Sequence, residues 1–190
     1  MIIIGITGTL GAGKGTLVDY LVNNKGFAHF SVRGYLQIEM AKRGMPNNRD
    51  SMTVLANELR AQNSPSYVTD QLFLQAKESG KNCIIESIRT PGEIISLKKK
   101  GAFYLFAVDA NAELRYERIK IRKSATDNIS FETFKANEAR EMNSDDPNKQ
   151  NLKKCIEMAD FTFDNNGEIS DLEKQAEIVI QKLLSHGQEF

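Results

Sequence analysis

Residues 8–16, GTLGAGKGT, combine closely spaced glycines with one lysine. Glycine has no Cβ, so consecutive backbone N–H groups of such a loop can converge on one bulky anion such as phosphate. Gly8, Gly13 and Lys14 fit the pattern G-x-x-x-x-G-K, in which the lysine reaches the outer phosphates of a nucleotide. The pattern normally continues with Ser or Thr, whose hydroxyl contacts magnesium, but this chain has Gly15 there and Thr16 one place later. The expected nucleotide-binding residues are Gly8, Gly11, Ala12, Gly13, Lys14, Gly15 and Thr16.

Two arginines form a second candidate group. Arg118 and Arg122 lie four residues apart in a helix-like stretch, so both side chains would project from one face. Two guanidinium groups placed in this way could clamp transferring phosphates and neutralise their charge. The alternative is a solvated face on which Glu113 and Glu117 pair with them. Their position after a strand-like run of a phosphate-loop chain favours the first role, so both are candidate catalytic residues, as is Lys14 of the glycine-rich loop.

Charged residues also follow the other strand-like runs. Glu86 ends the run NCIIE, where a carboxylate could hold a magnesium-bound water or accept a proton from an attacking hydroxyl. Alternatively, Glu86 is a strand-end acid that Arg89 neutralises. Arg33 and Arg89 are candidate substrate-binding residues, because guanidinium forks bind phosphate bidentately. Arg60 is a weaker candidate, as is Arg140, and either could be a surface residue. His29 and His186 have no partner in motif spacing.

The elements that must position these residues alternate along the chain. Strand-like runs occur at 2–7, 27–30, 82–86, 103–108 and 161–163. Helical periodicity follows the glycine-rich loop up to Gly26 and recurs at 35–42, 53–61, 67–77, 112–123 and 172–184. Ser170 and Glu173 are spaced as a capping box for the last helix. This alternation predicts an α/β fold with a mainly parallel sheet, whose strand carboxyl ends would gather the charged residues at one edge.

Length and composition limit the classes of protein. A chain of 190 residues is long enough for one compact domain, and we expect a single domain over residues 1–190. Polar residues dominate 124–150, which we interpret as a helical excursion and a candidate lid. With 25 basic and 25 acidic residues the surface lacks the positive field that nucleic-acid binding uses. Cys83 and Cys155 have no metal-ligand spacing and read as buried thiols.

The apolar start of the chain is too short to be a signal peptide or a membrane span. We therefore expect a soluble cytoplasmic protein that has a small-molecule acceptor as its partner and binds neither nucleic acid nor membrane.

The phosphate loop with Gly15 and Thr16 resembles that of adenylate kinases and their nucleoside monophosphate kinase relatives. The segment IIESIRTP is similar to the one whose arginine grips the acceptor phosphate, which implies that role for Arg89. The segment SVRGYL resembles the acceptor-binding segment, with Gln37 in place of the usual arginine and Arg33 as a substitute. Downstream, DANAELRYERIKIR and MADFTFDNNG resemble dephospho-CoA kinases. The resemblance implies a three-layer P-loop kinase fold with a five-stranded parallel sheet, helices on both faces and an arginine-bearing helical lid.

The same resemblance implies ATP as the donor and Mg²⁺ held largely through water and phosphates, with Thr16 and Glu86 as candidate metal contacts. The predicted reaction is transfer of the γ-phosphoryl group of ATP to a small-molecule acceptor, first of all a nucleotide or nucleoside monophosphate. Dephospho-CoA or another small alcohol or phosphate is an open alternative acceptor. A nucleotide-binding ATPase or regulatory protein without kinase activity is the alternative of another class.

A GTP-driven switch would share the phosphate loop but needs D-x-x-G after the third strand and N-K-x-D. Neither motif occurs at the required position in this sequence. The letters DNNG at 164–167 match D-x-x-G only after the last strand-like run. There Asn165 or Asn166 would line the adenine pocket, and Asn166 is the expected cofactor-binding residue.

Overall fold

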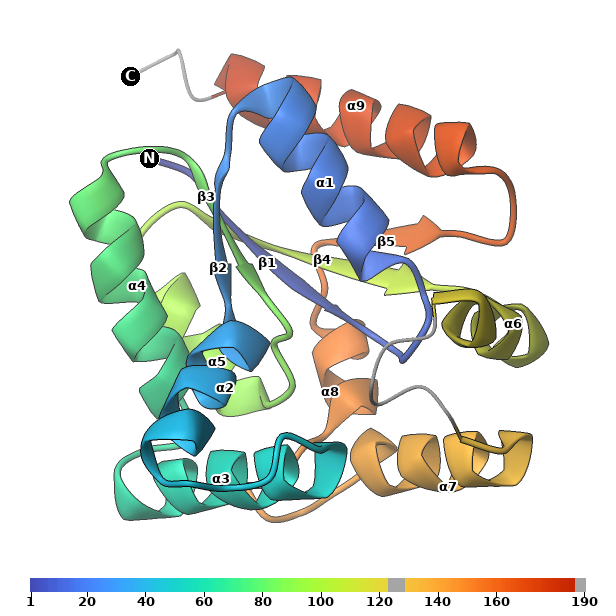
Figure 1. The fold of residues 1–190 in the computed structure, drawn as a ribbon. Coiled ribbons are helices and arrows are strands. Elements are labelled where there is room, and N and C mark those ends of the chain that lie inside the picture. The colour runs from blue at the N-terminus through green and yellow to red at the C-terminus, as the bar shows by residue number, and fades with distance from the viewer. Residues whose placement is uncertain (123–128, 187–190) are drawn as a thin grey trace.

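The computed structural model describes residues 1–122 and 129–186 of the chain. Its centre is a sheet of five parallel strands in the order β2-β3-β1-β4-β5 (Figure 1). The strands are β1 Ile3–Gly8, β2 Ala28–Ser31, β3 Cys83–Glu86, β4 Phe103–Asp109 and β5 Phe161–Asp164. This arrangement confirms the predicted α/β fold, and every predicted strand is present to within a residue or two at each end.

The helices alternate with the strands, as the periodicity indicates. They are α1 Lys14–Lys25, α2 Val32–Lys42, α3 Arg49–Gln62, α4 Tyr67–Ser79, α5 Pro91–Lys98, α6 Ala112–Arg122, α7 Phe131–Met142, α8 Leu152–Glu157 and α9 Ile169–His186. Helix α5 was not predicted from the sequence, because its apolar run is short. Its start is nevertheless well marked, since Thr90 and Glu93 form a capping box around Pro91.

The capping box expected at Ser170 is wrong. The last helix starts one residue earlier, at Ile169, so Ser170 lies within its first turn. Here the side chain of Asp171 accepts a hydrogen bond from the Glu168 backbone N–H at 3.2 Å. Asp171, the third residue of the helix, thus makes the half of a capping box in which the side chain reaches back to the backbone N–H of the residue before the helix.

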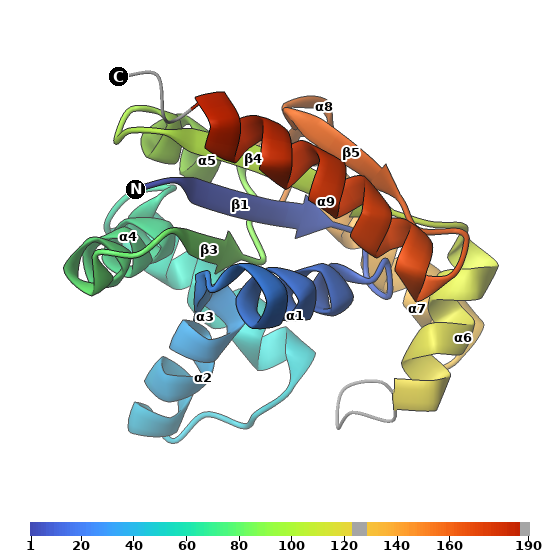
Figure 2. The same ribbon diagram turned by 90° about the horizontal axis from the view of Figure 1, so that it is seen from above.

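Alternate residues of each strand enter two separate cores, because successive side chains of a strand point to opposite faces. Ile3 packs with apolar residues of α2, α3, α4, α5 and α8, whereas Ile4 and Ile6 pack with those of α1 and α9. The sheet is therefore covered on both faces, by α1 and α9 on one and by α4, α5 and α8 on the other (Figures 1 and 2). Cys83 and Cys155 are free and buried, as predicted.

The segment expected to be a lid spans 124–150, of which residues 124–128 lie outside the described part, as does Lys123 of the helix predicted over 112–123. Within the described part, α7 is the expected helix, and its Phe134 is fully buried against Tyr116 of α6. The carboxyl end of α7 meets the start of α3 through the ion pair of Arg140 with Asp50 at 3.1 Å (Figure 1). A buried ring contact and an ion pair thus join the described part of this segment to the rest of the molecule.

Among the described residues, no helix combines the length and the apolar character needed to cross a membrane.

Candidate functional site

The glycine-rich loop joins the end of β1 to the start of α1, and its conformation depends on glycine. Gly8 and Gly13 have φ of 134° and 99°, values that residues with a Cβ rarely adopt. A Cβ on Gly8 would lie 2.2 Å from the Val108 carbonyl oxygen, and one on Gly13 would lie 2.0 Å from Asn165 Nδ2. Gly13 is also the N-cap of α1 and makes no side-chain cap bond. The amino end of α1 therefore offers backbone N–H groups, the arrangement that binds phosphate.

Lys14, the first residue of α1, lies over this loop. Its Nζ donates hydrogen bonds to the carbonyl oxygens of Gly8 at 2.9 Å and Thr9 at 2.7 Å. These bonds use two of the three ammonium protons. Burial, followed by the charge of Arg89, lowers the pKa of Lys14 to about 7, although the carboxylate of Glu86 opposes this shift. A phosphate group near Nζ would restore the charged form, because opposite charge favours it.

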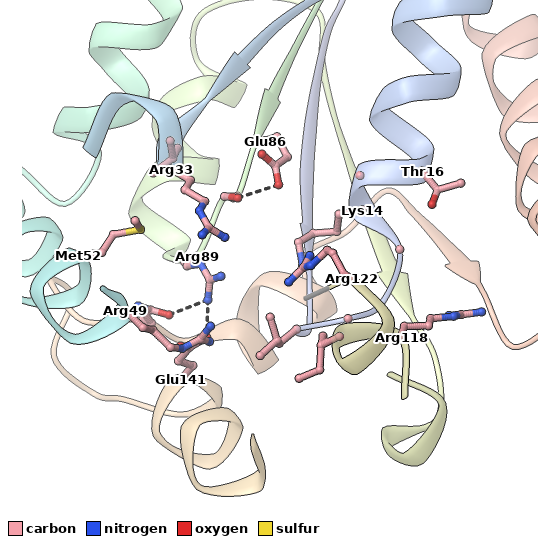
Figure 3. Close-up of a pocket in the computed structure, with 18 of the residues that line it drawn as sticks. Lys14, Thr16, Arg33, Arg49, Met52, Glu86, Arg89, Arg118, Arg122 and Glu141 are labelled. Carbon is pink, nitrogen blue, oxygen red and sulfur yellow. Dashed lines mark hydrogen bonds and ion pairs between the residues drawn. The ribbon is translucent and has the colours of Figure 1, made fainter. Parts of the chain in front are cut away.

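A cavity of about 650 Å³ lies beside the loop, at the carboxyl ends of the central strands (Figure 3). Most of the residues singled out from the sequence line it. They are Gly11, Gly13, Lys14, Gly15, Thr16, Arg33, Glu86, Arg89, Arg118 and Arg122. The parallel sheet thus brings residues more than a hundred positions apart to one place.

Three expected nucleotide-binding residues are not among those that line the cavity. Gly8 lies beneath the loop against Val108, and Ala12 is fully buried in the core. Asn166 is exposed and hydrogen-bonds Asp164 and the backbone N–H of Asn111. Its neighbour Asn165 is buried, lines the cavity and donates from Nδ2 to the Ala12 carbonyl oxygen at 2.8 Å. Asn165 is therefore the residue that the structure places at the loop.

Glu86 ends β3 and lies in a network that does not include Arg89. The hydroxyl of Ser87 donates to Oε1 at 2.8 Å, that of Ser31 donates to Oε2 at 3.1 Å, and His29 Nε2 lies 3.7 Å from Oε2. Burial raises the pKa of Glu86, but His29, Ser87 and the charge of Lys14 outweigh it and hold the pKa at about 2. The interpretation that Arg89 neutralises Glu86 is wrong, since the carboxylate partner of Arg89 is elsewhere.

That partner is Glu141, near the end of α7. Its two carboxylate oxygens accept one hydrogen bond each from Arg49 of α3 and from Arg89 (Figure 3). Arg89 Nη1 also donates to Gln150 Oε1 at 3.0 Å. Burial raises the pKa of Glu141, yet the charges of Arg89 and Arg49 bring it below its usual range. Arg49 and Glu141 were not predicted as site residues, because 92 positions separate them and no local pattern links them.

Arg118 and Arg122 of α6 both line the cavity. The solvated-face alternative does not hold for Arg118, whose Nη1 is buried and has no hydrogen-bond partner in the described part of the chain. Glu117 instead pairs with Lys120 at 3.1 Å. Figure 3 shows Arg122 reaching toward Lys14, whereas Arg118 points away from Lys14, toward the side of the view on which Thr16 lies.

Arg115 of α6 was also missed, although it lies one turn before Arg118. It is 5% exposed and donates from Nε to the Ala110 carbonyl oxygen at 2.7 Å. Its Nη2 contacts both carboxylate oxygens of Glu138 in α7, at 2.8 and 3.2 Å, and its Nη1 bonds the loop at Leu10. The sequence contains many charged residues, and nothing in it distinguishes an arginine that becomes buried from those that stay on the surface. Arg115 could therefore not be predicted as a site residue.

No group of three or more His, Cys, Asp and Glu within residues 1–122 and 129–186 could hold a metal ion by itself. The oxygen donors that line the cavity include the two expected metal contacts, the Thr16 hydroxyl and the Glu86 carboxylate, and also the Asp19 carboxylate. Such hard oxygen donors suit Mg²⁺, which usually keeps several waters and takes phosphate oxygens as further ligands.

Residues 4–143 match the family model described as an AAA domain. The chain belongs to the AAA domain family. The matched range runs from β1 through α7, so it covers the phosphate loop, both groups of arginines, Glu86 and Glu141.

Two relatives of this AAA-domain chain match it along nearly its whole length. It is 27% identical over 188 residues to a UPF0200/UPF0201 protein of Archaeoglobus fulgidus, a match that covers 96% of the chain and 56% of the relative. It is 27% identical over 191 residues to a UPF0200 protein of Methanothermobacter thermautotrophicus, with 100% and 94% covered. The chain thus spans little more than half the length of the first relative and nearly all of the second.

Solved structures share the architecture. TT1252 from Thermus thermophilus has a TM-score of 0.60 at 22% identity, over 96% of this chain and 97% of that one. Shikimate kinase from Bacteroides thetaiotaomicron scores 0.59 at 12% identity, over 97% and 98%. Dephospho-CoA kinase from Campylobacter jejuni scores 0.51 at 18% identity, over 95% and 96%. These likenesses show a P-loop kinase-like fold and confirm the resemblance to small-molecule kinases.

Proposed function

We propose that this chain is an ATP-dependent phosphotransferase that moves the γ-phosphoryl group of ATP to a small-molecule acceptor, most naturally a nucleotide or nucleoside monophosphate. One observation carries the proposal. The phosphate-loop lysine, two arginines of α6 and the arginines and carboxylate beyond β2 and β3 all line the same cavity. A protein that only bound a nucleotide would need no second cationic group across the cavity from its phosphate loop.

The donor half of the cavity binds and orients the triphosphate. Backbone N–H groups at the start of α1 hold phosphate oxygens, and Lys14 moves from the loop carbonyls to the outer phosphates. Arg118 and Arg122 offset the negative charge on the transferring group. Asn165 keeps the loop in shape by its bond to Ala12. Little covalent work falls to the protein, since alignment and charge stabilisation dominate phosphoryl transfer.

In the transfer itself, an oxygen of the acceptor forms a bond to the γ-phosphorus while the bond from this phosphorus to the β–γ bridging oxygen breaks. ADP leaves, and an attacking hydroxyl loses its proton to solvent or to the transferred phosphate. With a pKa of about 2, Glu86 is a poor proton acceptor near neutral pH. We assign it instead to holding water around Mg²⁺, with Thr16 as the other candidate contact. When bound, Mg²⁺ supplies charge neutralisation at the phosphates.

The acceptor half lies between α2, α3 and the segment after β3. Arg33 and Arg89 both line it, and Val32 and Leu36 of α2 give it an apolar wall. Arg89 is held by Glu141 and Gln150, and the backbone carbonyl of Arg89 accepts from Asn151 at 2.9 Å. An arginine fixed in this way loses little conformational entropy when it binds an anion. We therefore keep Arg89 as the principal acceptor-binding residue, with Arg33 beside it.

The proposal is tested by nucleotide binding and turnover of the wild type and of Lys14→Ala. We expect the variant to fold normally, because the hydrogen bonds of the Lys14 side chain within the described part go to two loop carbonyls. It should lose most ATP affinity and turnover. Gly15→Ala, which adds a Cβ where no atom lies within 4 Å, serves as a matched loop control. Equal ATP affinity and turnover in wild type and Lys14→Ala would remove the basis of the proposed function.

A further inference from the structure

One face of α3 lines the acceptor half of the cavity. Arg49, Thr53, Ala56 and Arg60 recur at spacings of four, three and four residues, which places them on one side of the helix. Met52 lines the cavity beside them. This face therefore has an arginine at each end and small or apolar residues between them, a combination that suits a molecule with an anionic group and an uncharged body.

Arg60 is the least expected member of this face, because only 2% of it is exposed. Its Nη2 donates to Glu93 Oε1 at 3.0 Å, and the two charges cancel. Its Nε and Nη1, however, are buried and have no hydrogen-bond partner within residues 1–122 and 129–186. Unpaired buried donors are costly, and native proteins keep them chiefly where a ligand, ion or water completes them.

Arg49 repeats the pattern at the other end of the face. Its Nη2 bonds Glu141, while its Nε is buried and has no partner in the described part. Burial lowers the pKa of Arg49 and the charge of Glu141 opposes this, but a guanidinium stays protonated in proteins. The side chain therefore carries a full charge and a spare donor at the cavity.

Glu93 and Glu141 join these residues to Arg89. Glu93 Oε2 accepts from the backbone N–H of Arg89 at 2.8 Å, while Oε1 holds Arg60. Both side-chain bonds of Arg89, to Glu141 and Gln150, come from Nη1. Three guanidinium groups thus share two carboxylates, and the cluster has one positive charge that its own acids do not balance.

We propose that Arg49, Arg60 and Arg89 form a subsite for an anionic group of the acceptor, a phosphate monoester or a carboxylate. The inference rests on the proposed function and goes beyond it, because it names the class of acceptor and adds two residues of α3. Both kinds of group have terminal oxygens that accept bidentate bonds from guanidinium forks. Met52 and Ala56 lie beside the uncharged part of the same molecule.

Conservative variants test the subsite without unpairing the acids. Arg60→Lys keeps a charge for Glu93 but removes the two unpartnered nitrogens, and Arg49→Lys keeps a charge for Glu141 but removes Nε. Arg43→Lys is the matched control, because Arg43 pairs with Glu58 at 2.9 Å outside the cavity. Folding is checked by circular dichroism and thermal unfolding. If the buried Arg60→Lys fails to fold, the more accessible Arg49→Lys carries the test.

The probes are inorganic phosphate and acetate, titrated by calorimetry at constant ionic strength with a non-hydrolysable ATP analogue on the phosphate loop. We expect one anion to bind, and the preferred probe identifies the class. Affinity should fall about tenfold or more in Arg60→Lys and Arg49→Lys and stay unchanged in Arg43→Lys. No binding of either probe, or equal affinity in all variants, would overturn the subsite.

A second arm separates this inference from the proposed function. If the ATP analogue fails to bind, the proposed function fails, but the same anion titration on Lys14→Ala without nucleotide still reads the subsite. Loss of anion affinity when Arg60→Lys is combined with Lys14→Ala would support the subsite even then. Unchanged anion affinity in that double variant would contradict it.

Discussion

Arg115 donates a hydrogen bond from Nη1 to the carbonyl oxygen of Leu10 at 3.2 Å, which ties α6 directly to the backbone of the phosphate loop. The same guanidinium contacts Glu138 of α7 through Nη2. A Cβ on Gly11 would lie 2.4 Å from the Arg115 carbonyl oxygen, so loop and helix also pack closely here. One buried side chain therefore connects the loop that would hold ATP with the helix that supplies Glu141.

Arg115→Lys should destabilise the protein and weaken nucleotide binding together. Lysine keeps the charge but can serve only one of the three acceptors well, so we expect a loss of about 2 kcal/mol in the free energy of unfolding. ATP affinity should fall several-fold because the loop loses its bond at Leu10. Denaturant unfolding and calorimetric ATP titration measure the two effects.

Glu138→Gln is the matched variant for Arg115→Lys. It removes the ion pair to α7 but leaves the bonds of Arg115 to Ala110 and Leu10 in place. We expect lower stability with nearly unchanged ATP affinity. If both variants weaken ATP binding equally, Arg115 does not act on the phosphate loop through Leu10.

Binding of ATP should be accompanied by proton uptake near pH 8. Burial lowers the pKa of Lys14 to about 7 from its ordinary value of 10.5, so much of it is neutral at pH 8. Phosphate favours the ammonium, and the group must gain a proton as the nucleotide binds. Calorimetry in Hepes and Tris, whose ionisation heats differ, measures the uptake, and Lys14→Met should abolish it.

The lowered pKa of Lys14 also determines how its contribution to the free energy of unfolding changes with pH. Because the folded value lies below the unfolded one, the unfolded chain binds more protons between about pH 7 and 10.5. The contribution of Lys14 to stability therefore rises with pH across this window, and Lys14→Met should flatten that rise. A wild type that takes up no proton on binding ATP at pH 8 would show that Lys14 is already charged in the free protein.

Gly15→Ser should strengthen the dependence of nucleotide binding on Mg²⁺. The position has no atom within 4 Å of an added Cβ, so serine fits without strain and restores the hydroxyl that the common pattern places there. We expect half-maximal binding of ATP at several-fold lower Mg²⁺ concentration. Gly15→Ala adds the same Cβ without the hydroxyl and should leave the Mg²⁺ dependence as in the wild type. Identical Mg²⁺ curves for the serine and alanine variants would mean that the metal lies away from this position.

Arg118→Ala and Arg122→Ala should lower turnover far more than ATP affinity. An arginine that stabilises charge chiefly in the transition state costs about a thousandfold in rate when removed, with little change in ground-state binding. Lys120→Ala is the control, since Lys120 lies on the same helix but pairs with the exposed Glu117. Near-wild-type turnover in both arginine variants, measured with a verified acceptor, would contradict a catalytic role for α6.

The parts of the site that the sequence could predict are local in the chain. The loop up to Lys14 is contiguous, and the ends of parallel strands meet at one edge, so Arg33, Glu86 and Arg89 could be placed near it in advance. The choice of Asn166 over Asn165 failed because one step along a chain leaving a strand reverses which side chain faces the loop. The hydrophobic pattern of the sequence does not determine at which residue the strand ends, so it does not show which of the two asparagines faces the loop.

The contacts that organise the acceptor half could not be predicted in this way. Arg49 and Glu141 meet because α3 and α7 approach end to end, a consequence of how both helices pack against the rest of the fold. Arg60 was grouped with possible surface residues, yet it is buried because Glu93, from the unpredicted α5, compensates its charge. A buried charged residue depends on a distant partner, and a single sequence does not show which one.

The central proposal is tested most directly by incubating the protein with Mg-ATP and a panel of acceptors, and measuring both ADP and phosphorylated acceptor by mass spectrometry. The panel contains nucleoside monophosphates, dephospho-CoA, and small alcohols that carry a phosphate or a carboxylate. We expect ADP release that depends on one class of anionic acceptor, in equal amount to the phosphorylated product, and its loss in Lys14→Ala. ADP release that is the same without any acceptor, or no release with the whole panel despite ATP binding, would contradict a phosphotransferase function.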